Sequence, residues 1–169
     1  MRKRNKYEVI RELWKGVAVP ACMYGAEIVN FRRNDVVELE KIQHKIGRIA
    51  LGAPKYTAVE GIRAELGYST WEERIAKSRV AFARKLESMD DDRWAKKLWL
   101  QRGNDSKWKK ETNKLERKWG TVGMEWNNAK KQIEEEGIRK WKEGVEQKST
   151  LRWLTNKEKP RKEWCYTGS

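Results

Sequence analysis

One apolar stripe within residues 34–67 constrains the fold more than any other feature of the chain. It consists of four aliphatic residues at helical spacing, Leu39, Ile42, Ile46 and Ile49. That spacing places all four side chains on one face of an α-helix. We expect Asn34 to cap the start of this helix, and Gly52 followed by Pro54 to end it. A shorter helix from about Thr57 to Leu66 is expected to follow and to close on Gly67.

The central helix also carries a cationic edge. Lys41, Lys45 and Arg48 lie on a face turned well away from the aliphatic stripe. Side chains three and four residues apart share a helical face, so the two sets are separated around the helix axis. The sequence therefore predicts one buried edge and one solvent-facing basic edge on the same helix.

Helical periodicity also precedes this stretch. Residues 1–6 form a basic arm, and an apolar face then recurs from Tyr7 onward. Pro20 is expected to kink that helix or to make it restart at Ala21. Residues 21–29 are the most apolar stretch and are expected to lie in the core, with Tyr24 packed among them.

A second basic helix is expected after the central one. Thr70 and Glu73 have the spacing of a capping box, which predicts a helix start. Four cations lie beside its apolar side, namely Arg74, Lys77, Arg84 and Lys85. Two such helices packed through their apolar sides would present their basic edges together and follow a phosphate backbone. For any one helix, an ordinary solvated face is the commoner explanation.

The character of the sequence changes from Asn104 onward, where aliphatic residues become sparse while tryptophans continue. Tryptophan among lysine and arginine suits stacking on bases, but an aromatic stripe on a basic helix more often packs onto its own domain. We favour packing for most of them. The predicted fold is all-α, with a compact helical bundle over residues 1–89, a Trp-rich helical extension over 90–154 and a basic extended tail over 155–169.

The charge balance favours a polyanionic partner. The chain holds 39 Lys and Arg against 25 Asp and Glu, a formal net charge of +14. Such a field attracts nucleic acid or an acidic membrane surface. No apolar run is long enough to cross a bilayer, so we expect no membrane partner. Cys22 and Cys165 lack disulfide or zinc spacing, which favours a reducing, intracellular compartment in the cytoplasm, the nucleus or both.

No catalytic constellation is evident. His44 is the only histidine, and it has no obvious Ser, Cys or Asp partner. Residues 90–92 are three aspartates, for which helix capping is a stronger explanation than metal binding. There is no phosphate-cradling glycine loop and no Cys/His cluster. We therefore expect a chain that is not an enzyme and that needs no cofactor or metal.

Several short segments resemble, in the same order, one region of a known protein family. They are Met23–Glu27, Leu39–Gln43, Leu51–Pro54 and Ala64–Gly67, with residues 148–169 resembling a later stretch. The region follows the reverse transcriptase palm in polyproteins of non-LTR (LINE-type) retrotransposons, of the kind abundant in ticks and other arthropods.

The resemblance implies that the bundle is a reverse transcriptase thumb separated from its palm. It would grip the backbone of the template–primer duplex, RNA or DNA, without sequence preference, while the rest of the polyprotein does the chemistry. The Tyr-x-Asp-Asp signature of the palm is not in this chain, so polymerase activity would belong to the parent protein. The nucleic-acid contacts are assigned to Lys41, Lys45, Arg48, Lys55, Arg74, Lys77, Arg84 and Lys85.

Two other interpretations remain open. In the first interpretation, the chain is a helical scaffold or interaction module that binds an acidic protein partner. In the other it is a pseudogene-like fragment without a present role. Binding to RNA and DNA of any sequence that weakens uniformly with salt would separate the nucleic-acid hypothesis from both.

Overall fold

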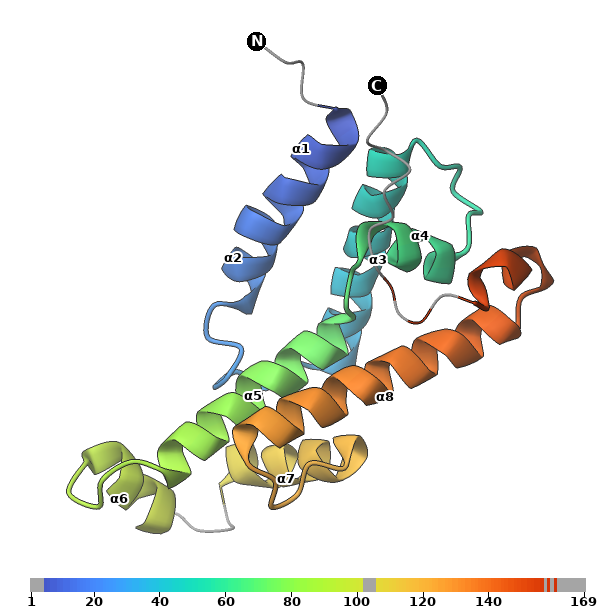
Figure 1. The fold of residues 1–169 in the computed structure, drawn as a ribbon. Helices are drawn as coiled ribbons and strands as arrows, with labels where there is room; N and C mark the ends of the chain where they lie inside the picture. The colour runs from blue at the N-terminus through green and yellow to red at the C-terminus, as the bar shows by residue number, and fades with distance from the viewer. Residues whose placement is uncertain (1–4, 102–105, 157, 159, 161–169) are drawn as a thin grey trace. The chain divides into compact units, whose positions relative to one another are not determined.

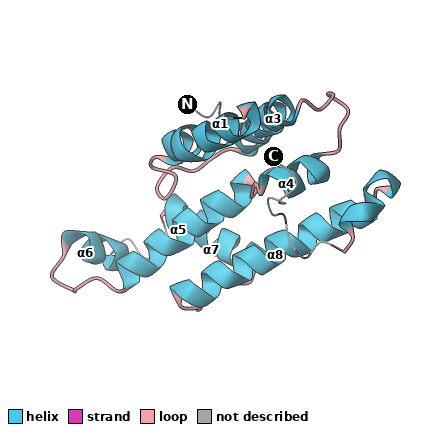
Figure 2. Cartoon of the chain, turned by 45° about the horizontal axis from the view of Figure 1, so that its top comes forward, coloured by secondary structure: helices cyan, strands magenta, loops and turns pink. Residues whose placement is uncertain are grey.

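The computed structural model describes residues 5–101, 106–156, 158 and 160. Every regular element within these ranges is helical, which confirms the predicted all-α class (Figure 2). Figure 1 shows the elements in chain order, which are α1 (Lys6–Leu13), the π-helical turn η1 (Trp14–Ala18), α2 (Val19–Met23), α3 (Arg33–Leu51), α4 (Val59–Leu66), α5 (Trp71–Glu87), α6 (Trp94–Gln101), α7 (Lys107–Trp119), α8 (Trp126–Glu146) and the 3₁₀ helix η3 (Ser149–Leu154).

The chain divides into two compact units that alternate along the sequence. Unit 1 comprises residues 1–24, 33–71 and 137–169, and unit 2 comprises residues 25–32 and 72–136. Helix α8 contributes its first half to unit 2 and its second half to unit 1. The sequence-based boundaries at residues 89 and 154 fall inside unit 2 and unit 1 respectively. The tail from residue 155 lies mostly outside the described residues.

The N-terminal helix runs through Pro20 instead of stopping there. Figure 1 shows α1, η1 and α2 as one continuous rod. Proline removes a backbone donor and clashes with the preceding turn of a regular α-helix. Here a wider π-helical turn at Trp14–Ala18 comes directly before α2, in which Pro20 is the second residue. The backbone at Ala18 and Val19 is helical, so the restart expected at Ala21 does not occur.

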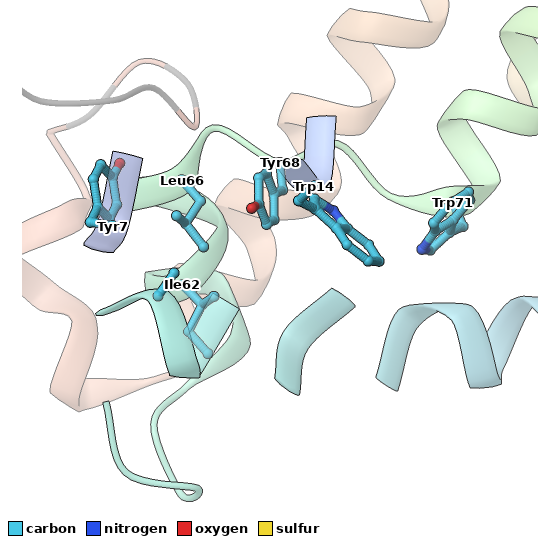
Figure 3. Close-up of a cluster of buried hydrophobic side chains, with 7 residues drawn as sticks. Tyr7, Trp14, Ile62, Leu66, Tyr68 and Trp71 are labelled. Carbon is cyan, nitrogen blue, oxygen red and sulfur yellow. The ribbon is translucent and has the colours of Figure 1, made fainter. Parts of the chain in front are cut away.

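Aromatic side chains form the main core of unit 1 (Figure 3). Trp14 of η1 lies between Tyr68 and Trp71, with ring centroids 6.4 and 6.2 Å away. The Trp71 ring meets Trp14 edge-on, an arrangement that aromatic quadrupoles favour. Tyr7 donates its hydroxyl to the Glu65 carbonyl at 3.0 Å, which satisfies the one polar atom of this buried ring.

The buried face of α3 is rotated from the predicted one. Its buried residues are Gln43, Gly47 and Ala50, whereas Ile42 and Ile49 are about half exposed. Of the predicted stripe, only Leu39 and Ile46 pack against the core, and both are partly buried. Helix α3 also begins at Arg33, so Asn34 lies inside it and is not the cap. Its predicted end is confirmed, because Gly52 adopts the left-handed φ of +62°.

Polar satisfaction and close approach explain this rotation. The Gln43 amide accepts from Trp14 Nε1 at 3.4 Å and donates to the Ser69 carbonyl at 3.1 Å, so its burial leaves no polar atom stranded. A Cβ on Gly47 would lie 2.5 Å from Ile62 Cγ2 of α4. The absent side chain lets α4 pack directly on the α3 backbone. Helix α4 ends at Gly67, as predicted.

A second cluster completes unit 1. Trp141 and Val145 of α8 pack with Leu151 and Leu154 of η3. Trp141 Nε1 donates to the Glu60 carbonyl at 3.0 Å, which ties this cluster to α4. Trp141 therefore packs within its own domain, as the sequence favoured for most tryptophans of the Trp-rich extension.

The core of unit 2 is built from α5, α7 and α8. It contains Ala76 and Val80 of α5, Trp119 of α7, and Ala129 and Ile133 of α8. Helix α5 begins at Trp71, directly after Thr70, where the capping box predicted a start. Gly120 and Gly123, with φ of +65° and +70°, reverse the chain between α7 and α8.

The prediction that residues 21–29 form core is wrong. Tyr24 is 92% exposed, and Ile28 and Val29 are 60% and 52% exposed. Only Ala26 is fully buried. The stretch is short and turns at Gly25, whose φ is +73°. A chain reversal cannot direct successive apolar side chains to one face, so high apolarity here does not produce burial.

Candidate nucleic-acid interface

One shallow, open depression in unit 1 brings several cations together. It is lined by Lys6, Lys45, Arg48, Ile49, Gly52, Ala53 and Lys55. Lys6 comes from the first turn of α1, Lys45 and Arg48 from the last two turns of α3, and Lys55 from the loop that follows. Three of the eight predicted contact residues therefore share one surface, and the fourth cation is one that sequence reasoning missed.

The lysines of this depression have no counter-charge among the residues that the structure describes. Within the described ranges, no carboxylate lies at ion-pairing distance from Lys6, Lys45 or Lys55. The carbonyl end of α3 offers partial negative charge to Arg48, the basic residue of its last turn. That interaction does not apply to Lys6 at the start of α1. The depression is thus a place of concentrated positive potential with an apolar floor.

Arg48 has a different role from the lysines. Its Nη2 donates to the Thr57 carbonyl at 3.0 Å, and the side chain is only partly exposed. The guanidinium therefore fastens the loop after α3 to the helix. Arg48 remains at the edge of the depression, but at least one of its donors is already engaged.

Lys6 was missed because residues 1–6 were interpreted as an arm. The structure begins α1 at Lys6, with Asn5 as its N-cap accepting from Tyr7 N at 3.3 Å. An asparagine two residues before the first apolar residue of a periodic run is a helix-start signal. That signal was available in the sequence and would have placed Lys6 on a helix.

Lys41 lies outside the depression but close to it along α3. It is one helical turn before Lys45 and pairs with Glu38 at 2.7 Å. Both side chains are about two-thirds exposed, so the pair contributes little to stability. Lys41 is therefore accessible to a ligand along this edge of the helix.

The predicted contacts in unit 2 are mostly occupied within that unit. Lys77 pairs with Glu134 at 2.9 Å, and Arg74 is half-buried. Arg84 pairs with Glu87 and with the nearly buried Glu116, each at 2.8 Å. Lys85 is exposed. The edge of α5 is thus not a row of solvent-facing cations, and Arg84 in particular serves the packing of unit 2.

His44 lies on α3 near the depression and is held neutral. Its pKa is lowered from 6.5 to about 4, mainly by burial and in smaller part by the cations Arg48 and Arg63, against a raising effect of Glu60. The Glu40 carboxylate is 3.5 Å from His44 Nε2, but it already accepts from Trp71 N at 2.6 Å.

The lowered pKa of His44 predicts a pH-dependent stability. As pH falls from 6.5 towards 4, His44 binds a proton in the unfolded chain but stays neutral in the folded chain. The free energy of unfolding therefore decreases across this window. The loss is expected to reach about 2–3 kcal/mol near pH 4. Denaturant unfolding of the wild type and of His44→Gln at several pH values measures it. The variant should show a shallower decline, and parallel curves would contradict the assignment.

The described residues offer no metal site and no membrane span. Among them, no group of three or more His, Cys, Asp and Glu side chains is placed to bind a metal ion. The aspartates at 90–92 are all exposed and precede α6. In the same residues, none of the helices combines the length and apolarity needed to traverse a bilayer.

Comparison with known proteins identified no relative of this chain. No protein-family model, curated protein or solved structure matches the chain. The likeness to the post-palm region of LINE-type polyproteins therefore stays a hypothesis.

Proposed function

We propose that the chain binds the sugar–phosphate backbone of nucleic acid without sequence preference, and that the cationic depression of unit 1 makes the main contacts. The observation that carries the proposal is the convergence of Lys6, Lys45 and Lys55 on one surface without carboxylate partners in the described part of the chain. Lys41 extends the same edge by one helical turn. The chain itself performs no reaction.

The chemistry of the depression fits phosphate better than base edges. Lysine ammonium groups are point charges on flexible stems, and they attract phosphate without the bidentate geometry that reads a base. The floor contributes Ile49, Gly52 and Ala53, which offer no side-chain hydrogen bonds. Contacts of this kind position a nucleic acid but carry no sequence information.

The resemblance to LINE-type reverse transcriptases supplies the physiological setting of the proposal. In that setting the ligand is the template–primer duplex, and the chain is a thumb-like module whose palm lies elsewhere in the polyprotein. The location is then intracellular. The all-helical character of the described residues supports a thumb-like module.

Neutralising the three lysines tests the proposal. Lys6→Gln, Lys45→Gln and Lys55→Gln together should weaken duplex binding and flatten its salt dependence. Each lost phosphate contact reduces the slope of log K against log salt by about 0.9, so a change of about two to three is expected. Fluorescence anisotropy of a labelled duplex at several salt concentrations measures both quantities.

A matched triple variant controls for net charge. Lys114→Gln, Lys130→Gln and Lys142→Gln also remove three exposed lysines, so both proteins carry 14 − 3 = +11. The control should keep nearly the wild-type slope. Equal losses in the two proteins would show that overall charge binds the ligand and the depression does not. Absence of wild-type binding at low salt would reject the function.

A second candidate function is a helical interaction module for an acidic protein. One observation favours it, an apolar depression in unit 2 lined by Ile28, Phe82, Leu86, Ala95, Leu98, Trp99, Ser106 and Trp108. Lys109 lies 4.3 Å over the Trp99 ring, so a cation borders this apolar surface. Saturable binding of one protein that survives moderate salt would favour this function over nucleic-acid binding.

A further inference from the structure

We infer that the turn after α3 captures an unpaired nucleotide, with Tyr56 stacking on its base while the neighbouring lysines hold the flanking phosphates. This inference rests on the proposed function and names its preferred ligand, a single-stranded segment beside or within a nucleic acid. It assigns to Tyr56 a role that backbone binding alone does not require.

The turn is built to present two side chains. Thr57 N donates to the Pro54 carbonyl at 3.0 Å, which closes a β-turn with Lys55 and Tyr56 at its two central positions. The Thr57 carbonyl in turn accepts from Arg48 Nη2 at 3.0 Å. The far end of the turn is therefore fastened to α3, and Lys55 and Tyr56 project from a fixed base. Figure 1 shows the α3–α4 connection as an open loop beyond the end of α3.

The Tyr56 ring is open to solvent. Its side chain belongs to a residue that is 86% exposed, and within the described part of the chain it makes no ring contact or hydrogen bond. Its neighbour Lys55 lines the cationic depression. An aromatic face directly beside a phosphate-binding surface is the combination that single-strand binding proteins use.

Base pairing decides which nucleic acid can use this ring. In a duplex the faces of internal bases are already covered by their neighbours, so the Tyr56 ring cannot stack on them. An unpaired base exposes a face at no unstacking cost. Ile49, which is 46% exposed on the same depression, adds apolar contact for a sugar or base edge. The surface therefore discriminates by strandedness and not by sequence.

Three labelled probes test the inference, an oligothymidylate single strand, a blunt duplex and the same duplex with a single-stranded overhang. Tyr56→Leu should weaken binding of the single strand and the overhang about tenfold, while the blunt duplex changes less than about twofold. Tyr56→Phe should retain wild-type affinity, because the ring face remains. Tyr24→Leu is the control, since Tyr24 is 92% exposed in the same unit without lining the cationic depression.

The outcomes separate this inference from the proposed function. If wild-type protein binds all probes with a steep salt dependence but Tyr56→Leu changes none of them, the turn has no stacking role and the inference is overturned alone. The same holds if Tyr24→Leu matches Tyr56→Leu. If wild-type protein binds no probe at low salt, the proposed function fails first. Selective loss of single-strand affinity in Tyr56→Leu, restored in Tyr56→Phe, supports the inference.

Discussion

Replacing Trp14 with alanine is expected to lower the free energy of unfolding by about 3–5 kcal/mol, the range for removing a large aromatic side chain from a core. Trp14 is 5% exposed and lies between the Tyr68 and Trp71 rings. Its indole also donates to Gln43 Oε1, so truncation leaves a fully buried amide oxygen without that donor. Denaturant unfolding followed by circular dichroism measures the change.

Two further variants separate the contributions at this position. Trp14→Phe keeps most of the ring contacts but loses the indole donor, so it should be affected less than the alanine variant. Trp153→Ala is the control, because Trp153 lies in the same unit but is 61% exposed, and a change within about 0.5 kcal/mol is expected. A Trp14→Ala protein that unfolds like the wild type would show that the aromatic cluster does not hold unit 1 together.

The helices could be predicted largely from periodicity, whereas their orientation could not. The start of α5 and the ends of α3 and α4 follow from local signals, a capping pair and two glycines with positive φ. The buried face of α3 does not, because it depends on partners distant in sequence. Gln43 is buried only because Trp14 and Ser69 satisfy its amide, and Gly47 only because α4 approaches there.

The tryptophans show the same division between local and tertiary information. Packing was favoured for most tryptophans of the Trp-rich extension, and Trp119 and Trp141 are buried. Spacing did not distinguish Trp14, which is 5% exposed, from Trp94, which is 78% exposed. Trp14 lies within the periodic run that starts at Tyr7 and Trp94 begins α6, and the contacts of Trp14 with Tyr68 and Trp71 could not be inferred from either local pattern.

For the candidate site, the sequence could predict which lysines are exposed. It could not predict which cations form hydrogen bonds or ion pairs within the chain. Lys41 and Lys45 are exposed, as the helical pattern indicated. Arg48 and Arg84 belong to the same pattern, yet their guanidinium groups hold the chain's own carbonyls and carboxylates. Arginine has five donors in a planar fork and often joins backbone segments, a use that a charge pattern cannot reveal.

Replacing Arg84 with methionine is expected to destabilise unit 2 by about 3–5 kcal/mol, because it leaves Glu116 as an unpaired, nearly buried charge. The side chains of Arg84 and Glu116 are 15% and 10% exposed. Arg84 Nε also donates to the Met124 carbonyl at 2.7 Å, and Nη2 to the Thr121 carbonyl at 3.2 Å. One guanidinium thus joins α5 to α7 and to the turn before α8.

The pH dependence of the stability lost in Arg84→Met identifies the cause of that loss. Burial already raises the pKa of Glu116, and Arg84 is what lowers it again. Without Arg84 the pKa rises further, so the folded variant holds a proton that the unfolded chain releases as pH rises. Its stability deficit should therefore shrink in acid and grow towards neutral pH. Adding Glu116→Gln to Arg84→Met should recover part of the loss at neutral pH by removing the stranded charge.

The exposed Lys118–Glu72 ion pair is a control for the loss of stability expected in Arg84→Met. Lys118→Met breaks the Lys118–Glu72 pair, whose side chains are about half exposed, and should change stability by less than about 1 kcal/mol. If Arg84→Met is equally mild, Glu116 is not stranded and the assignment is wrong. If it is severe, any nucleic-acid affinity lost with Arg84 reflects the unfolding of unit 2. Loss of binding then counts as evidence for a phosphate contact only at lysines such as Lys45, whose removal leaves the fold intact.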